Sequence, residues 1–407
     1  MYTPAYRPNF TFFLRFYSAI FLLMSVSIAS AQIRSEFGQE LLQKRLEESK
    51  AVERDFTIDY QVSNIFNDHV EFGLSIDPNT SSLAGRDDPQ LLGVINRVGV
   101  NFQGTLPLSR RFWLKLQSNP QFENYIGEDG KLNEFDGFAV PFLTELNFQP
   151  TSKLPPLTTS YQLQRLSRKD PAFDSLQHQI GFRFGKVLEY NLRAQRFDDD
   201  QTRREDFLLV GATSHQGVGR LQVGFFKQLL GKLEYSIERE AYKDNLNSLV
   251  FGVAGIKPEE SRTDVRHFGS VKLIEIATGR LVLQEELNIF LNRSNVEFYD
   301  FSSIEAAIGA FYKINSRSWA RLRLSRLRIK FDGRQVRDER GVVAKDADDR
   351  RYDQIGLNLQ LNWQFRDNLT LFADYQFIKN NTNEESEIFD FLNYKNNIVS
   401  LAIQATY

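Results

Sequence analysis

The sequence predicts an all-β fold, a transmembrane antiparallel up-and-down β-barrel of about 16–18 strands with a short N-terminal helical segment. Three observations support this fold class. Long segments alternate between apolar and polar residues, short and long connections alternate along the chain, and no apolar run after Gln32 is long enough to span a bilayer as a helix. A chain that crosses a membrane without such helices needs a closed barrel, because every backbone polar group must be satisfied internally.

The N-terminus has the pattern of an export signal. Arg7 and Arg15 form a basic region, an apolar stretch covers 16–28, and Ala29-Ser30-Ala31 places small residues before a cleavage site at Gln32. A transmembrane anchor is the alternative, but the apolar run is shorter than the roughly 20 residues that a spanning helix needs. We therefore expect residues 1–31 to be a signal peptide that is cleaved after Ala31.

Residues 32–54 form a polar segment with helical spacing of its few apolar residues, among them Leu41, Leu42 and Leu46. Two interpretations stay open, a solvated leader before the first strand and a segment that plugs the lumen. The barrel itself is expected to cover residues 55–407.

The clearest strand pattern runs from Gln354 to Phe365. One face carries Ile355, Leu357, Leu359, Leu361, Trp363 and Phe365, and the other is rich in amides. Successive side chains of a strand point to opposite sides, so this segment has one apolar and one polar face. Its length matches the roughly 9–11 residues of a tilted membrane-spanning strand. The same alternation recurs at 180–184, 221–225, 304–312, 369–377 and 399–407.

The connections between these segments differ in length in a regular way. Short turns are predicted at 107–110, 151–156, 277–280, 315–318 and 366–368, and longer polar loops at 119–136, 257–263, 293–300, 332–351 and 381–394. Short turns on one rim and long loops on the other are typical of outer-membrane barrels. The strand count stays open at 178–195 and 219–241, because each could be one long strand or a tight hairpin.

The C-terminal segment carries a resemblance. Val399, Leu401, Ile403 and Tyr407 place apolar residues on one face and an aromatic residue at the end. The stretch from Tyr352 to Tyr407 resembles the closing hairpins of porin-like bacterial outer-membrane barrels. That resemblance implies that these four residues are an assembly signal read by the barrel-assembly machinery, and that the mature protein lies in the outer membrane of a Gram-negative bacterium among its lipids.

A run of bases at 321–330 is the main candidate for function. Arg321 and Arg323 alternate with leucines, and a β-bulge at Ser325-Arg326 would bring Arg326, Arg328 and Lys330 to the same side. Charges on the lipid face would cost roughly 2–4 kcal/mol each at mid-bilayer, so all five bases are expected to line the lumen or to stand above the membrane. With Asn358, Gln360 and Asn362 they would form a solute path. The alternative is a structural network in which the bases pair with lumen acids such as Glu305 and Glu286.

Composition limits the other classes of function. The chain lacks cysteine, which excludes disulfides and a thiolate site, and its net charge of −2 gives no support to a nucleic-acid partner. We expect no cofactor, no metal and no catalytic residue, although a cross-strand pair with one of His69, His178, His215 and His267 would allow a barrel hydrolase. The predicted function is a channel for small polar or anionic solutes, and an export or assembly pore for a surface polymer or lipoprotein is a further alternative. Oligomeric state is left open.

Overall fold

A computed structural model describes residues 55–67, 93–127, 136–151, 154–169, 174–197, 211–226, 228–242, 261–336, 348–383 and 393–406. The expected signal peptide, the polar segment 32–54, His69 and Tyr407 lie outside these residues and stay predictions. The strands are β1 (Asp55–Asn67), β2 (Gly93–Pro107), β3 (Phe112–Ser118), β4 (Gln121–Gly127), β5 (Gly137–Phe148), β6 (Leu157–Arg168), β7 (Ser175–Phe184), β8 (Leu188–Phe197), β9 (Ala212–Phe226), β10 (Leu229–Tyr242), β11 (Thr263–Ile276), β12 (Leu281–Ser294), β13 (Phe301–Lys313), β14 (Ser318–Gln335), β15 (Asp349–Arg366), β16 (Leu369–Thr382) and β17 (Tyr394–Thr406), with a 3-10 helix, η6 (Glu297–Tyr299).

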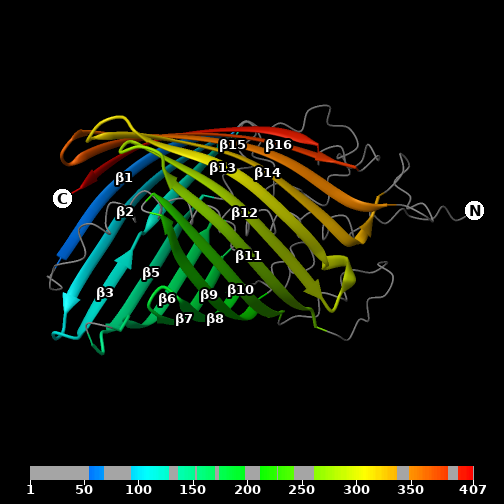
Figure 1. Cartoon of the computed structure of the whole chain (residues 1–407), viewed down its shortest axis with the longest axis horizontal. Helices are drawn as coiled ribbons and strands as arrows, with labels where there is room; N and C mark the ends of the chain where they lie inside the picture. The colour runs from blue at the N-terminus through cyan, green and yellow to red at the C-terminus, as the bar shows by residue number, and fades with distance from the viewer. Residues whose placement is uncertain are drawn as a thin grey trace, which may run out of the picture.

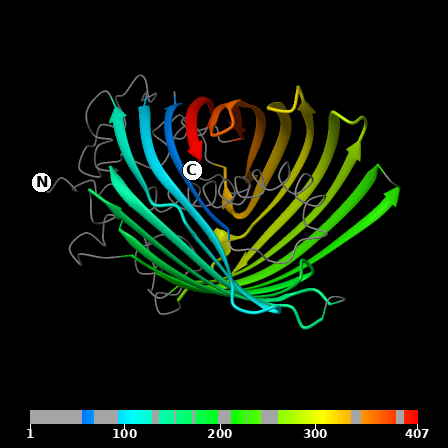
Figure 2. The same cartoon turned by 90° about the vertical axis from the view of Figure 1, so that its left-hand side faces the viewer.

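The strands form one closed antiparallel barrel. Apart from β3 and β4, each strand pairs with its neighbours in sequence, and β1 pairs with both β2 and β17, which closes the sheet. Figure 1 shows the strands crossing the wall obliquely, and Figure 2 shows the red β17 beside the blue β1. A closed sheet has no exposed edge, so its backbone groups are satisfied within the wall.

Two of the strand segments share one position in the wall. The half of β2 nearer the long-loop rim pairs with β4, and the half nearer the short-turn rim pairs with β3. Both β3 and β4 also pair with β5. The break falls at Asn119 and Pro120, because proline has no N–H to donate to the ladder. The carbonyl of Pro120 still accepts from Val100 N at 3.0 Å. The seventeen segments therefore make sixteen positions, within the predicted range.

The two rims differ as the sequence predicts. Connections at one rim are short, such as 185–187 and 314–317, while the other rim carries the long ones, such as 68–92 and 243–262. Both ambiguous segments are hairpins, β7–β8 and β9–β10. The expected loop 119–136 is too long, because residues 121–127 are strand.

The two faces of the wall have opposite character. Outward side chains such as Leu322, Ile355 and Trp363 are 40–54% exposed and form an apolar belt. Inward positions of the same strands carry Asn358, Gln360 and Asn362, so the alternation predicted for 354–365 is confirmed. Trp113 and Trp319 share the inward parity, and only Trp363 lies on the apolar belt.

The inner face is also packed at the long-loop rim. Phe301, Leu327, Ile329, Phe331 and Tyr352 form a buried cluster, with Phe290 stacked on Phe301 at 5.3 Å between ring centroids. The short helix η6 lies against this part of the wall, where Asn292 Nδ2 donates to the carbonyl of Tyr299 at 2.7 Å. These contacts fix the outer ends of β12–β15, from which the candidate site is built.

Candidate functional site: the lumen wall of β13–β16

The inward side chains of β14 and β15 face each other in register. Arg321 lies opposite Gln360, Arg323 opposite Asn358, and Trp319 opposite Asn362. Both arginines and Asn358 are buried in the wall, whereas Leu322 and Leu324 between them are exposed on the outside. Two predicted bases and the three predicted amides therefore share one strip of the lumen wall.

Arg323 belongs to an ion-pair network. Its Nη2 donates to Glu305 Oε1 at 2.7 Å, and Asn288 Nδ2 donates to the other oxygen of that carboxylate at 3.0 Å. Asn288 also donates to Glu286, whose carboxylate lies 3.4 Å from Lys272 Nζ. The structural pairing foreseen as the alternative to a solute path is thus present between Arg323 and Glu305, whereas Glu286 pairs with Lys272.

The amides continue this strip onto β16. Asn358 Nδ2 donates to Asp374 Oδ2 at 2.9 Å, and Gln376 Nε2 donates to Asp374 Oδ1 at 2.8 Å. Gln360 lies directly opposite Asp374. The strip therefore runs from cationic groups on β14, through amides on β15, to a carboxylate on β16. It offers donors and acceptors to a polar solute.

The other three predicted bases lie outside the lumen. The pairing of β14 is continuous from Trp319 to Lys330 on both sides, so the predicted bulge at Ser325-Arg326 is wrong. Without it, Arg326, Arg328 and Lys330 follow Leu322 and Leu324 on the outer face. Arg326 and Arg328 bond Asp353, at 2.5 Å and 3.4 Å, and Lys330 bonds Asp349 at 3.0 Å. A strand that continues beyond the apolar belt can carry charge outwards without burying it in lipid.

A second ion-pair network, not predicted from the sequence, lines the inner face of β8–β11, next to the first network. Arg193 bonds Glu238 and Glu240, and Arg266 bonds Glu240 at 2.5 Å. Arg220 bridges Glu189 at 2.6 Å and Glu234 at 2.8 Å. Glu234, Glu238 and Glu240 share one strand parity, and that pattern in the sequence is a signal that could have indicated this wall.

The three described histidines lie on the outer face in one repeated arrangement. In each, Nδ1 of the histidine forms a hydrogen bond with a tyrosine hydroxyl of the preceding strand. The pairs are Tyr161–His178 (2.8 Å), Tyr190–His215 (2.7 Å) and Tyr235–His267 (2.8 Å). In each pair the two residues are diagonal across the ladder, with ring centroids 6.1–6.3 Å apart. Because these histidines face outward, they cannot contact a solute in the lumen.

These six residues are named here the tyrosine–histidine girdle. Each histidine lies within five residues of the end of its strand at the long-loop rim, counted from Ser175, Ala212 and Thr263. Tyrosine and histidine have an apolar body and a polar tip, and such residues favour the boundary between lipid and water. The girdle therefore marks the outer boundary of the apolar belt.

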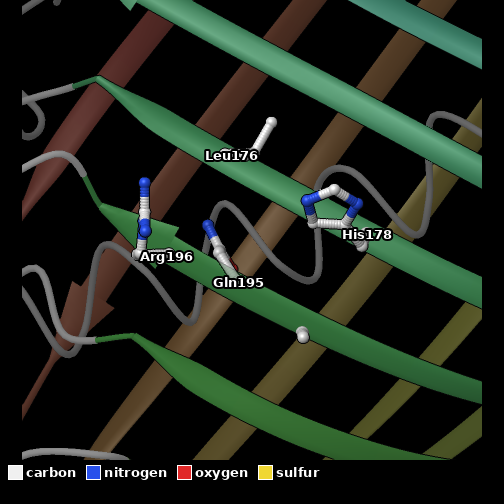
Figure 3. Close-up of a pocket in the computed structure, with 5 residues that line it drawn as sticks. Leu176, His178, Gln195 and Arg196 are labelled. Carbon is white, nitrogen blue, oxygen red and sulfur yellow. The ribbon is translucent and has the colours of Figure 1, made fainter.

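A shallow hollow accompanies the girdle on the outside of β7 and β8. It is lined by Leu176, His178, Ala194, Gln195 and Arg196, with the labelled side chains standing along these two strands (Figure 3). Leu176 and His178 share the parity of the exposed Ile180 and Phe182. The hollow is thus a feature of the outer surface and not of the lumen.

The predicted assembly residues of β17 are placed as outward side chains. Val399, Leu401 and Ile403 are exposed on the apolar belt, beside β16 and β1. Their role in assembly stays a prediction.

Within the residues that the structure describes, no group of three or more His, Cys, Asp or Glu side chains could hold a metal ion. No helix of that same part is long and apolar enough to cross a membrane.

The closed wall, the apolar belt, the polar lumen and the unequal rims together define a bacterial outer-membrane β-barrel. No family model and no curated protein matches the chain. Solved structures similar to it include OccAB1 of Acinetobacter baumannii, with 9% identity over 89% of this chain and 98% of that one and a TM-score of 0.49. OprD of Pseudomonas aeruginosa has 10% identity over 89% and 97% of the two chains, with a TM-score of 0.41. A bacterial polysaccharide outer-membrane secretin has 9% identity over 86% and 98%, with a TM-score of 0.46.

Proposed function

We propose that this barrel is a porin-like channel that passes small polar solutes, including anions, through its lumen. The observation that carries the proposal is the strip in which Arg321 and Arg323 face Gln360 and Asn358 across β14 and β15. Guanidinium and amide groups together bind carboxylates, phosphates and hydroxyl groups by hydrogen bonds. Water inside the barrel lets a solute exchange its hydration for these contacts and leave again.

The proposal distinguishes the two arginines. Arg323 shares its charge with Glu305, so its contribution to the field in the lumen is reduced. Arg321 lies nearer the short-turn rim, opposite Gln360. Cations on a lumen wall raise the local concentration of anions and favour their passage. Removal of Arg321 leaves the Arg323–Glu305 ion pair in place and is therefore the variant that tests how a lumen base affects selectivity.

The test is the reversal potential of the purified protein in planar bilayers under a salt gradient. We expect open-channel conductance for the unmodified chain and a shift toward cation preference in Arg321→Gln, with a larger shift in Arg321→Glu. The matched control is Arg326→Gln, which removes the same charge from the same strand but on its outer face. That control should leave the reversal potential unchanged.

Two results would count against the proposal. Membranes that stay silent with folded protein would exclude a passive channel and would favour the export or assembly pore. Conducting Arg321 variants with an unchanged reversal potential would show that this side chain stands clear of the solute path, and preference for anions would then be abandoned.

A further inference from the structure

The outer face of β14–β17 carries a second concentration of bases, separate from the lumen. Arg328, Lys330, Arg351, Lys379 and Lys395 all lie toward the long-loop rim on outward positions, and they are named here the outer basic patch. Lys330 lies directly opposite Arg351, and Lys379 directly opposite Lys395. Like charges that face each other across a ladder repel, so the wall itself gains nothing from these pairings.

The acids near the patch neutralise only part of it. Asp353 is held mainly by Arg326, through Nε at 2.9 Å and Nη2 at 2.5 Å, and lies 3.4 Å from Arg328. Asp349 lies 3.0 Å from Lys330, and Asp348 lies 3.6 Å from Arg351. Arg328 and Lys330 remain 58% and 51% exposed even with these partners. The patch therefore presents an excess of accessible positive charge.

The height of the patch matches the boundary of the apolar belt. Ile355, outward on β15, lies directly opposite both Arg326 and Lys379, and the exposed Leu359 and Leu361 continue from it toward the other rim. On β6–β11 the tyrosine–histidine girdle marks the same end of the strands. A lipid whose acyl chains pack on these leucines would place its headgroup at the bases.

We propose that the outer basic patch binds the phosphate groups of an anionic lipid in the outer leaflet, with the lipid's acyl chains on the adjoining apolar belt. Arginine binds phosphate through two parallel N–H groups, and lysine adds a point charge. The continuous apolar surface below the bases favours a phosphorylated lipid over a free anion. This inference does not depend on whether the lumen conducts.

The experiment measures lipid binding to the full chain in detergent by native mass spectrometry. The probes are bisphosphorylated lipid A, the same lipid after dephosphorylation, and inorganic phosphate as a competitor. Arg328→Gln/Lys330→Gln should weaken binding of bisphosphorylated lipid A about tenfold or more, since each base near a lipid surface contributes substantially. The matched control, Arg196→Gln/Arg239→Gln, removes two outward bases from β8 and β10, on the other side of the barrel, and should change binding less than about twofold.

Further arms separate the sources of any effect. Heat-dependent gel migration should show both double variants folded, and Arg328→Lys should keep most of the binding. Equal weakening in both double variants, or equal binding of dephosphorylated lipid, would overturn the proposal in favour of general attraction or plain apolar contact. Displacement of the lipid by millimolar inorganic phosphate would reduce the patch to a simple anion site. A dimer that needs the five bases and excludes lipid would instead make the patch a protein interface.

Discussion

Arg323 and Arg326 lie three residues apart on one strand, yet their surroundings differ completely. Arg323 faces the lumen wall, where its side chain is 10% exposed and bonds Glu305. Arg326 faces outward, 61% exposed, and bonds Asp353. Both pairs are short, so distance does not distinguish them. The difference is desolvation, because removing one partner of a buried pair leaves an uncompensated charge in a poorly solvated place.

Arg323→Ala should therefore destabilise the barrel by about 3–5 kcal/mol, whereas Arg326→Ala should have a clearly smaller effect, because its ion pair is exposed to water. Denaturant unfolding followed by tryptophan fluorescence measures both. The double variant Arg323→Ala/Glu305→Gln should recover part of the loss, because the orphaned carboxylate is gone. Equal losses in the two single variants would mean that the lumen solvates Glu305 as well as bulk water does.

At the scale of single elements, the turn between β7 and β8 explains why the sequence leaves the segment 178–195 open. Phe184 and Leu188 both point outward across a connection of three residues, so the alternation continues as though no turn were present. Gly185 begins the turn with a φ of +55°. A Cβ at that position would lie 2.6 Å from Cβ of Pro155 in the neighbouring turn. Only glycine fits both the backbone and the space.

Gly185→Ala should lower stability by more than about 1 kcal/mol, since the left-handed conformation and the contact with Pro155 both oppose a side chain. Gly279 offers a matched control in another short turn, because a Cβ there meets nothing within 4 Å. The apparent melting temperature of the purified barrel, read from heat-dependent gel migration, should fall for Gly185→Ala and hold for Gly279→Ala. A fall of the same size in both would show that any glycine substitution in these turns is harmful.

Two elements show where sequence patterns stop being sufficient. The parity slip near Ser325 suggests a bulge only on the assumption that the whole strand lies within the bilayer. In fact β14 runs 18 residues, and its outer end carries charges on the outward face, because it has passed the belt, and buried apolar residues on the inward face. The break at Pro120 divides one position of the wall into β3 and β4, and proline marks it in the sequence. Alternation predicts faces well, but it does not locate the membrane boundary along a strand.

For the whole molecule, the sequence was sufficient to predict the fold class and the short connections at one rim and long ones at the other. It was not sufficient to predict the partner of each side chain. The outward leucines and inward amides of 354–365 are confirmed because a period of two fixes faces without knowledge of register. The pairs Tyr161–His178 and Arg193–Glu240 depend on offsets between strands. Turn lengths and barrel shear set those offsets, and one sequence does not display them.

Closure is the property of the whole molecule that is most open to a direct test. The wall is sealed where β1 meets β17 over Asp59–Asn67, and Ser63 lies opposite Ala402 on the inner face. Directly opposed residues on antiparallel strands have Cα atoms roughly 4.5–5.5 Å apart, within the range of a disulfide. The chain contains no cysteine, so an introduced pair has no competitor.

Ser63→Cys/Ala402→Cys should therefore form an intramolecular disulfide in the folded barrel under mild oxidation. The cross-link joins residues far apart in the chain, so the denatured protein should migrate faster on a non-reducing gel than after reduction. The control is Ser63→Cys/Ile398→Cys, in which Ile398 lies opposite Asn67, four residues further along β1. That pair should stay reduced, because its Cα atoms are separated by roughly four residues of strand length. Cross-linking of the control alone would show that β1 and β17 pair in a different register. A failure of both pairs in folded protein would mean that β1 and β17 do not close the barrel.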